Sequence, residues 1–133
     1  MATVRPHHVG LTVTDIARAQ AWYMQALGLE LVLAFELSGN VRGAMLRNAA
    51  GAGIELFEVP DPHHGVADAD PPTAMRTTGL GHVAFEVDDL DEVYAALLAA
   101  GAASVWEPRS APEPGRRMAF VHDPDGNLIE LIA

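Results

Sequence analysis

Apolar and polar residues alternate along two short stretches of this chain that resemble each other. In the stretch GHVAFEVDDL, which begins at Gly81, three apolar residues alternate with small or polar ones. A strand with this pattern places His82 on the face opposite its apolar side chains. Asp88 and Asp89 follow, where a carboxylate can cap the first turn of a helix. The pattern therefore predicts a strand that leads directly into a helix.

The first copy of this pattern is HVGLTVTDI, which begins at His8. Each copy is followed by an alanine-rich helical segment that ends at a glycine, and each module closes with an apolar strand carrying one glutamate. His8 and Glu55 are 47 positions apart, and His82 and Glu130 are 48 positions apart. A repeat of this kind indicates a duplicated module that presents the same two side chains twice.

Both modules are predicted to have the element order β-α-β-β-β, which makes the chain an α+β protein. The first module is expected to contain strands over 8–13, 29–37, 41–47 and 54–59 and a helix over 15–27. The second is expected to contain strands over 81–87, 104–107, 116–122 and 128–132, a helix over 90–100 and a loop over 108–115. These spans follow from hydrophobic periodicity and from glycine, proline and asparagine at the turns.

The segment 60–79 differs from both modules because it is rich in proline and aspartate. It is too long for an ordinary turn, and its His63–His64 pair is interpreted as exposed rather than metal-binding. The predicted organisation is a first module over 1–59, a linker over 60–79 and a second module over 80–133. Together they are expected to form one domain.

Composition narrows the functional classes. Among 133 residues, 50% are hydrophobic, which is sufficient for a core, and the formal net charge is −10. The acidic balance argues against nucleic-acid and anionic-membrane partners, because phosphate binding needs a basic surface. The sequence has no cysteine, which excludes disulfides and thiolate ligands. No signal peptide or membrane-length apolar run is recognised, so a cytoplasmic protein is expected.

The repeated histidine and glutamate describe a site for a divalent metal ion. His8, Glu55, His82 and Glu130 would supply two imidazole nitrogens and two carboxylates. This donor set suits Ni, Zn, Co, Mn or Fe, and two glutamates balance the charge of a divalent cation. Four protein ligands in an octahedral sphere would leave two positions open for adjacent oxygen atoms of a small-molecule substrate.

Four segments carry a resemblance to a known family: HVGLTVTDIARAQAWYMQALGLELV, GIELFEV, GHVAFEVDDLDEVYAALLAAGA and FVHDPDGNLIELI. Together they cover nearly the whole chain, which resembles the vicinal oxygen chelate superfamily. That superfamily includes glyoxalase I, methylmalonyl-CoA epimerase, extradiol dioxygenases and the fosfomycin- and bleomycin-resistance proteins. The resemblance implies paired βαβββ modules whose curved, mixed sheets form a metal-binding cup, with the helices packed outside.

The resemblance places the family's four ligand positions on His8, Glu55, His82 and Glu130, with His7 one residue away from the first. A His-Glu-His-Glu set resembles bacterial glyoxalase I and implies lactoylglutathione-lyase-type isomerisation, or epimerisation, with Glu55 or Glu130 as the base. The segment after Glu55 lacks the asparagine that glyoxalase I uses on glutathione, and Thr12 stands where an arginine often contacts that cofactor. An Fe(II) extradiol-type dioxygenase and a non-catalytic drug- or metabolite-sequestering protein remain alternatives.

Strand parity extends the candidate site beyond the four ligands. Five residues share the face expected to carry the metal and are candidates for lining a substrate pocket: Thr12, Phe57, Met118, Phe120 and His122. Core packing would explain each of them as well. Because modules of this kind leave a sheet edge and an apolar face to be covered, a homodimer is expected. The linker allows the modules to pair within one chain or between two.

Overall fold

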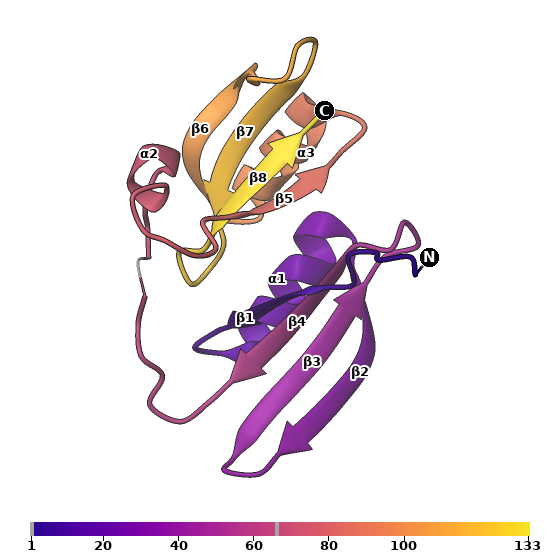
Figure 1. Ribbon diagram of the computed structural model, residues 1–133, viewed down its shortest axis with the longest axis vertical. Helices are drawn as coiled ribbons and strands as arrows, with labels where there is room; N and C mark the ends of the chain where they lie inside the picture. Colours follow the sequence, from indigo (N-terminus) through magenta and orange to yellow (C-terminus); the bar gives the residue numbers. More distant parts are fainter. Residues whose placement is uncertain (1, 66) are drawn as a thin grey trace. The chain divides into compact units, whose positions relative to one another are not determined.

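The computed structural model describes residues 2–65 and 67–133 and divides the chain into two units, Met1–Pro62 and His63–Ala133 (Figure 1). Each unit contains a strand, a helix and three further strands, in that order. The strands of each unit form one four-stranded mixed sheet. The predicted α+β class and the two βαβββ modules are therefore confirmed.

The first unit consists of β1 (Val9–Thr12), α1 (Ile16–Leu27), β2 (Glu30–Leu37), β3 (Val41–Arg47) and β4 (Gly53–Glu58). The strand order is β1-β4-β3-β2, in which β1 and β4 are parallel and the other neighbours antiparallel. Helix α1 is capped at its start by Asp15, whose side chain accepts the Arg18 amide, and at its end by Gly28 in the left-handed conformation. Its apolar face packs against fully buried strand residues such as Ile54 and Leu56.

The second unit repeats this plan with β5 (Val83–Glu86), α3 (Leu90–Ala99), β6 (Ala103–Ser110), β7 (Arg117–His122) and β8 (Leu128–Ile132). Its strand order is β5-β8-β7-β6, and β5 and β8 are parallel. Asp89 caps α3 by accepting the Glu92 amide. The core between α3 and the sheet includes Leu97, Ile129 and Leu131, which are fully buried.

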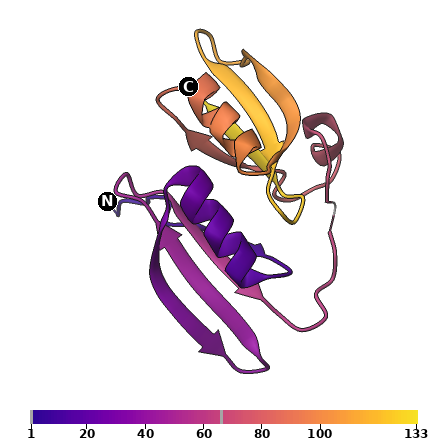
Figure 2. The same ribbon diagram turned by 180° about the vertical axis from the view of Figure 1, so that it is seen from behind.

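Each sheet has one face covered by a helix and one face that the helix leaves open. Figure 2 shows α1 and α3 lying across their own sheets. Because successive strand residues point to opposite faces, the buried Ile54 and Leu56 direct Glu55 to the open face of the first sheet. Ile129 and Leu131 do the same for Glu130 in the second sheet. Within the described ranges, no helix is long and apolar enough to cross a membrane.

The structure corrects one prediction and adds one element. The segment 60–79, predicted as a linker, contains the short helix α2 (Pro71–Ala74), capped by the Asp70 side chain on the Thr73 amide. The predicted loop over 108–115 was wrong in part, since β6 continues to Ser110. Pro108 lies in β6 where the pairing with β7 is irregular, and an edge strand tolerates the missing amide of proline.

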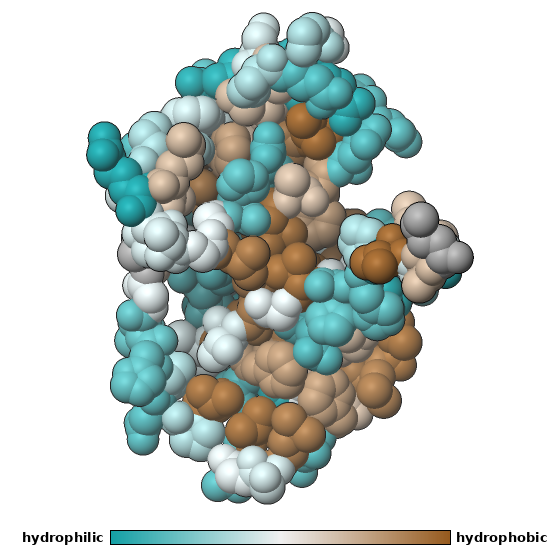
Figure 3. Space-filling model, in the orientation of Figure 1, coloured by the Kyte–Doolittle hydropathy of each residue, from teal (hydrophilic) through white to brown (hydrophobic). Residues whose placement is uncertain are grey.

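Strand β2 forms an edge of the first sheet and carries several exposed apolar side chains. Leu31, Val32, Leu33 and Leu37 are between 41% and 60% exposed. Figure 3 shows apolar side chains gathered on the surface over the region that β2 and β3 occupy in Figure 1. A long apolar edge strand offers unpaired backbone groups beside apolar surface, which are features of a surface that a partner covers.

Candidate functional site

The first half-site joins the start of β1 to the middle of β4. His8 directly precedes β1, and its Nε2 lies 3.4 Å from Oε1 of Glu55 on β4. The two strands are parallel, with Gly10 paired to Glu55, so His8 and Gly10 lie on the same sheet face as the glutamate. Both side chains are partly exposed, at 32% for His8 and 22% for Glu55. The backbone register thus brings together two residues that are distant in sequence.

The second half-site has the same construction. His82 directly precedes β5, and its Nε2 lies 2.9 Å from Oε2 of Glu130 on β8. Ala84 is paired to Glu130, so His82 stands two residues before the partner of the glutamate, as His8 does in the first unit. Glu130 is the more buried of the two carboxylates, with 14% of its side chain exposed. The two half-sites are therefore equivalent in strand register as well as in sequence.

Each histidine–glutamate pair has a donor geometry that fits a cation. A carboxylate faces Nε2 in both pairs, so either a proton or a cation must lie between the nitrogen and the oxygen for the contact to be attractive. Nitrogen and oxygen donors of this kind suit divalent transition metals. Over residues 2–65 and 67–133, no group of three or more histidine and acidic side chains is assembled that could hold a metal ion. One half-site alone therefore offers two possible donor side chains, one imidazole and one carboxylate.

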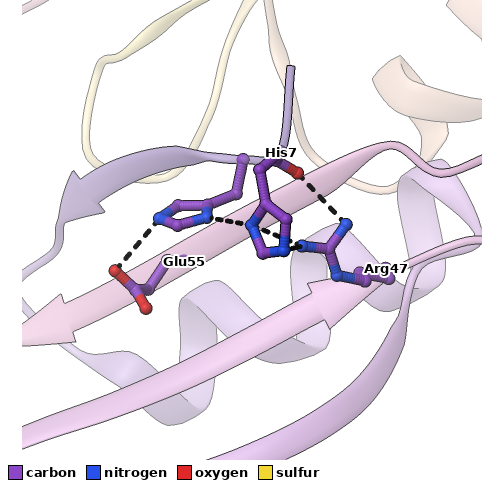
Figure 4. A network of polar contacts seen from close by, with 4 residues as sticks. His7, Arg47 and Glu55 are labelled. Carbon is purple, nitrogen blue, oxygen red and sulfur yellow. Dashed lines mark hydrogen bonds and ion pairs between the residues drawn. The ribbon is translucent and has the colours of Figure 1, made fainter. Parts of the chain in front are cut away.

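The surroundings of the two histidines differ. In the first unit, Nδ1 of His8 lies 2.7 Å from Nδ1 of His7, and a guanidinium nitrogen of Arg47 lies 2.8 Å from both ring nitrogens of His7 (Figure 4). Arg47 also donates to the His7 carbonyl oxygen at 3.1 Å. In the second unit, the position that matches His7 is Gly81, and the His82 ring instead contacts Phe120 edge to face at 5.5 Å.

The predicted pocket residues share the face of the two glutamates. Thr12 is paired with Phe57 on the first sheet, at positions two residues beyond the Gly10–Glu55 pair. Phe120 is paired with Glu130 on the second sheet, and Met118 lies two residues before Phe120. These positions match the predicted strand parity, while their contact with a substrate remains a prediction.

His122, the fifth predicted pocket residue, is held by the segment that precedes the second sheet. Its Nε2 lies 2.8 Å from the carbonyl oxygen of Ala69, and only 12% of its side chain is exposed. The tautomer that donates Nε2–H satisfies that carbonyl. The structure therefore gives His122 a structural partner, and its role toward a substrate remains a prediction.

The sequence interpretation missed two residues beside the second half-site. Trp106 contacts the Phe120 ring at 5.5 Å, and the Arg109 guanidinium lies 4.6 Å from the centre of the Trp106 ring. The rings of His82, Phe120 and Trp106 therefore contact one another in sequence, and the Arg109 guanidinium lies over the last of them. Strand parity does not reveal these contacts, because the pairing of β6 with β7 is irregular on both sides of Trp106.

The strand that carries Glu55 is tied to α1 by its last residue. Oε2 of Glu58 accepts the Ile16 amide at 2.7 Å, and Oε1 accepts from the Arg42 guanidinium. The hydrogen bond from Arg42 and then that from Ile16 lower the pKa of the Glu58 carboxyl from its ordinary value. The same ion pair raises the pKa of Arg42. A charged contact therefore fixes the first turn of α1 relative to β4.

Comparison with known proteins agrees with this architecture. The family model described as the Glyoxalase/Bleomycin resistance protein/Dioxygenase superfamily matches residues 5–131. A Vibrio cholerae protein named probable lactoylglutathione lyase is 32% identical over 143 residues, covering 99% of this chain and 92% of that protein.

Two solved structures show the same similarity in three dimensions. The glyoxalase family protein from Enterococcus faecalis has a TM-score of 0.77 and 26% identity, with 97% of each chain covered. Glyoxalase I from Zea mays has a TM-score of 0.74 and 26% identity, and the match covers 96% of this chain and 44% of the maize chain. The chain belongs to the glyoxalase/bleomycin resistance protein/dioxygenase superfamily.

Proposed function

We propose that this protein is a metal-dependent enzyme of glyoxalase type that transfers a proton next to a carbonyl group of a small substrate. The observation that carries the proposal is the pair of register-equivalent half-sites, His8 with Glu55 and His82 with Glu130. Membership of the superfamily and the lactoylglutathione lyase name of the Vibrio cholerae relative support it. The two half-sites would have to meet, within one chain or between two chains, to give four ligands.

The proposed roles follow from the chemistry of the four side chains. The imidazoles and carboxylates would hold one divalent ion, of Ni, Zn, Co, Mn or Fe, at distances of about 2.0–2.2 Å. When bound, this ion would supply Lewis-acid polarisation to two neighbouring substrate oxygens. Either Glu55 or Glu130 would take the proton from the carbon beside the carbonyl and return it, to the neighbouring carbon in an isomerase or to the opposite face in an epimerase.

The open faces of the two sheets would supply the substrate contacts. On the first sheet, Thr12 and Phe57 lie on the face that carries Glu55. On the second sheet, Met118, Phe120 and His122 lie on the face that carries Glu130. This distribution favours a substrate with an apolar portion near the metal-chelating oxygens, since aromatic and thioether side chains outnumber hydroxyls.

Matched glutamate substitutions test the proposed base. Glu55→Gln and Glu130→Gln each keep the side-chain shape while removing a base and one unit of charge. Loss of the base should slow solvent exchange of a deuterated substrate by about 10²–10⁴-fold, whereas loss of the other glutamate should mainly weaken metal binding. Glu107→Gln, on an exposed strand position, is the control. Full metal content and full turnover in both site variants would refute the proposal.

The dependence on metal and oxygen separates this function from its alternatives. Proton transfer should require the metal and proceed without O₂ across a panel of 2-oxoaldehyde–thiol adducts and 2-substituted thioesters. Turnover that appears only with Fe(II) and O₂ would assign the protein to ring-cleaving oxygenation instead. Tight binding without turnover would assign it to drug or metabolite sequestration. His82→Ala should abolish stoichiometric metal binding, and full occupancy in that variant would refute the ligand assignment.

We also propose that the protein acts as a homodimer in the cytoplasm. The exposed apolar side chains Leu31, Val32, Leu33 and Leu37 on the edge strand β2 support the assembly. Covering these side chains by a second copy would remove apolar surface from water and protect the edge. Sedimentation velocity at micromolar concentration should give a dimer, and a monomer at that concentration would refute the assembly.

A further inference from the structure

We propose that Arg109, stacked on Trp106, is a specificity-determining residue that binds a carboxylate at the far end of the substrate. The substrate class is then a small carboxylic acid in which an apolar portion separates the charged end from the metal-chelating oxygens. The inference rests on the proposed function, because it takes the face of the second sheet that carries Glu130 as the substrate face. Both residues lie on β6, the edge strand of that sheet (Figure 1).

A bulge in β6 brings Arg109 onto the same face as Trp106. Side chains three positions apart on a regular strand point to opposite faces. In this sheet, Trp106 is paired with Phe120 on β7. Arg109 is paired with Met118, only two positions before Phe120, so β6 contains one residue more than β7 over this stretch. Because Phe120 is also paired with Glu130, Arg109 points to the face that carries this glutamate.

The contacts of the Arg109 guanidinium leave its two terminal nitrogens in a position to bind an anion. Its central carbon lies 4.6 Å from the centre of the Trp106 ring, and its Nε donates to the carbonyl oxygen of Glu107 at 3.2 Å. Stacking uses the flat face of the guanidinium, and the Nε bond uses one edge. The terminal nitrogens then form a planar fork that matches the two oxygens of a carboxylate.

The charged surroundings of Arg109 differ from those of two other arginines in the second unit. Arg116 pairs with Glu86 at 3.4 Å. Arg117 pairs with Asp91 at 2.8 Å. Across residues 2–65 and 67–133, no carboxylate lies within ion-pair distance of Arg109, although the formal net charge of the chain is −10. One guanidinium balances one negative charge, which favours a carboxylate over a phosphate dianion.

An apolar path joins the guanidinium to the second half-site. The rings of Trp106 and His82 each contact the ring of Phe120 at 5.5 Å. Trp106, Phe120 and Glu130 lie side by side on three adjacent strands. Neighbouring strands are about 4.8 Å apart, so Trp106 and Glu130 are separated by about 10 Å. A substrate chelated beside Glu130 would cross this distance over aromatic rings before its far end meets Arg109.

The matching positions of the first sheet are apolar. Leu33 takes the position of Trp106 in the pairing of strands across the sheet. Phe35 takes the position of Arg109 and lies two residues after Leu33, with regular pairing between them. The cation and the bulge that places it therefore belong to the second unit, and the charged end of the substrate should lie beside β6.

Binding of octanoate and octanamide to the metal-free protein tests the inference without any reaction. The two probes have the same apolar chain, whose extended length is comparable to the path from Arg109 to Glu130, and they differ in head-group charge. Loss of a hydrogen bond to a charged group costs about 10–100-fold in affinity. Isothermal titration calorimetry should therefore show that octanoate binds about 10–100-fold more tightly than octanamide.

Substitutions assign this preference to the guanidinium. Arg109→Met should weaken octanoate binding to the level of octanamide and leave octanamide binding unchanged. Arg109→Lys keeps the charge without the planar fork, so it should restore part of the preference. Arg18→Met removes the same charge from an exposed position on α1 and is the matched control, which should keep the full preference.

Three results would overturn the inference. The first is equal affinity of the wild type for the two probes, or no measurable binding of octanoate. The second is a preference for octanoate that survives in Arg109→Met. The third is an equal loss of affinity for both probes in that variant, which would give Arg109 a purely structural role in the bulge.

Kinetics connect the inference to the proposed function and keep the two separable. For a substrate with a distal carboxylate, Arg109→Met should raise KM by about 10–100-fold and leave kcat nearly unchanged, because the charge lies away from the reacting carbon. Octanoate binding through Arg109 in a protein that turns over nothing would refute the proposed function and leave the carboxylate site intact. Turnover with the same KM in the wild type and in Arg109→Met would overturn this inference alone.

Discussion

Removing the carboxylate of Glu58 should destabilise the first unit, because this side chain joins the end of β4 to the start of α1. It accepts the amide of Ile16 at 2.7 Å and the guanidinium of Arg42, and three quarters of the side chain is removed from solvent. The Ile16 amide is one of the amides at a helix start that have no partner within the helix. Glu58→Ala leaves that amide without its acceptor.

The magnitude follows from the hydrogen bond to Ile16. A bond to a charged group contributes about 1.5–3 kcal/mol, and a carboxylate at a helix N-terminus adds a fraction of 1 kcal/mol. Glu58→Ala should therefore lower the free energy of unfolding by about 2–3 kcal/mol near pH 7. Glu58→Gln keeps a hydrogen-bond acceptor and should lose less. Arg42→Met should have the smallest effect, because the guanidinium is half exposed.

Acidic pH should also remove the stabilisation that the Glu58 carboxylate gives to the first unit. The pKa of Glu58 is lowered in the folded protein, so its stabilisation is fully present above the ordinary value of 4.5 and is lost as the pH falls through the lower, folded value. Urea unfolding at about pH 7 and about pH 3 measures both effects. The wild type should lose more stability than Glu58→Gln over this range. A cost below about 0.5 kcal/mol for Glu58→Ala, or identical acid dependence in the two proteins, would refute the reasoning.

Three further substitutions test the packing around the candidate site. Gly43→Ala places a Cβ in steric conflict with the ring of Phe35, so it should lower the free energy of unfolding by about 1–3 kcal/mol in thermal unfolding, and Phe35→Leu should relieve part of that loss. Asp123 is buried and accepts three hydrogen bonds in the turn before β8, so Asp123→Ala should cost more than about 2 kcal/mol in urea unfolding; a near-neutral change would contradict this role. Tyr94→Phe removes the hydroxyl contact to Ser104 and should lower the free energy of unfolding by about 0.5–1.5 kcal/mol. A double variant that removes both the Tyr94 and the Ser104 hydroxyl should lose less than the sum of the two single losses, and strict additivity would exclude the hydrogen bond.

Most of the secondary structure could be predicted because the signals are local. Alternation of apolar residues identified the strands, and the aspartates and glycines at helix ends marked α1 and α3. Pro108 was read as the beginning of a loop because proline removes an amide, but β6 is an edge strand and its pairing is irregular at that point. The helix at Pro71 was hidden by a composition that is typical of linkers.

The candidate site was predictable to the extent that strand parity and register determine it. His8 directly precedes β1, two residues before the strand partner of Glu55, and a repeat in sequence was enough to indicate that the two side chains share a sheet face. The contact between Arg47 and His7 was not predictable, because it joins side chains of residues that lie 40 positions apart in the sequence. Trp106 was missed because irregular pairing removes the parity rule on which the prediction relied.

The shared register of the two half-sites has a consequence for insertions and deletions. Each histidine reaches its glutamate through a fixed alignment of two parallel strands, so deleting one residue between His8 and Gly10, or one from the corresponding part of the second unit, would turn the histidine to the helix-covered face. Insertions or deletions of a few residues within 60–65 or 76–79 change only the length of a connection, at a small entropic cost. The chain should therefore tolerate length variation between its units far better than variation of a single residue at the start of β1 or β5.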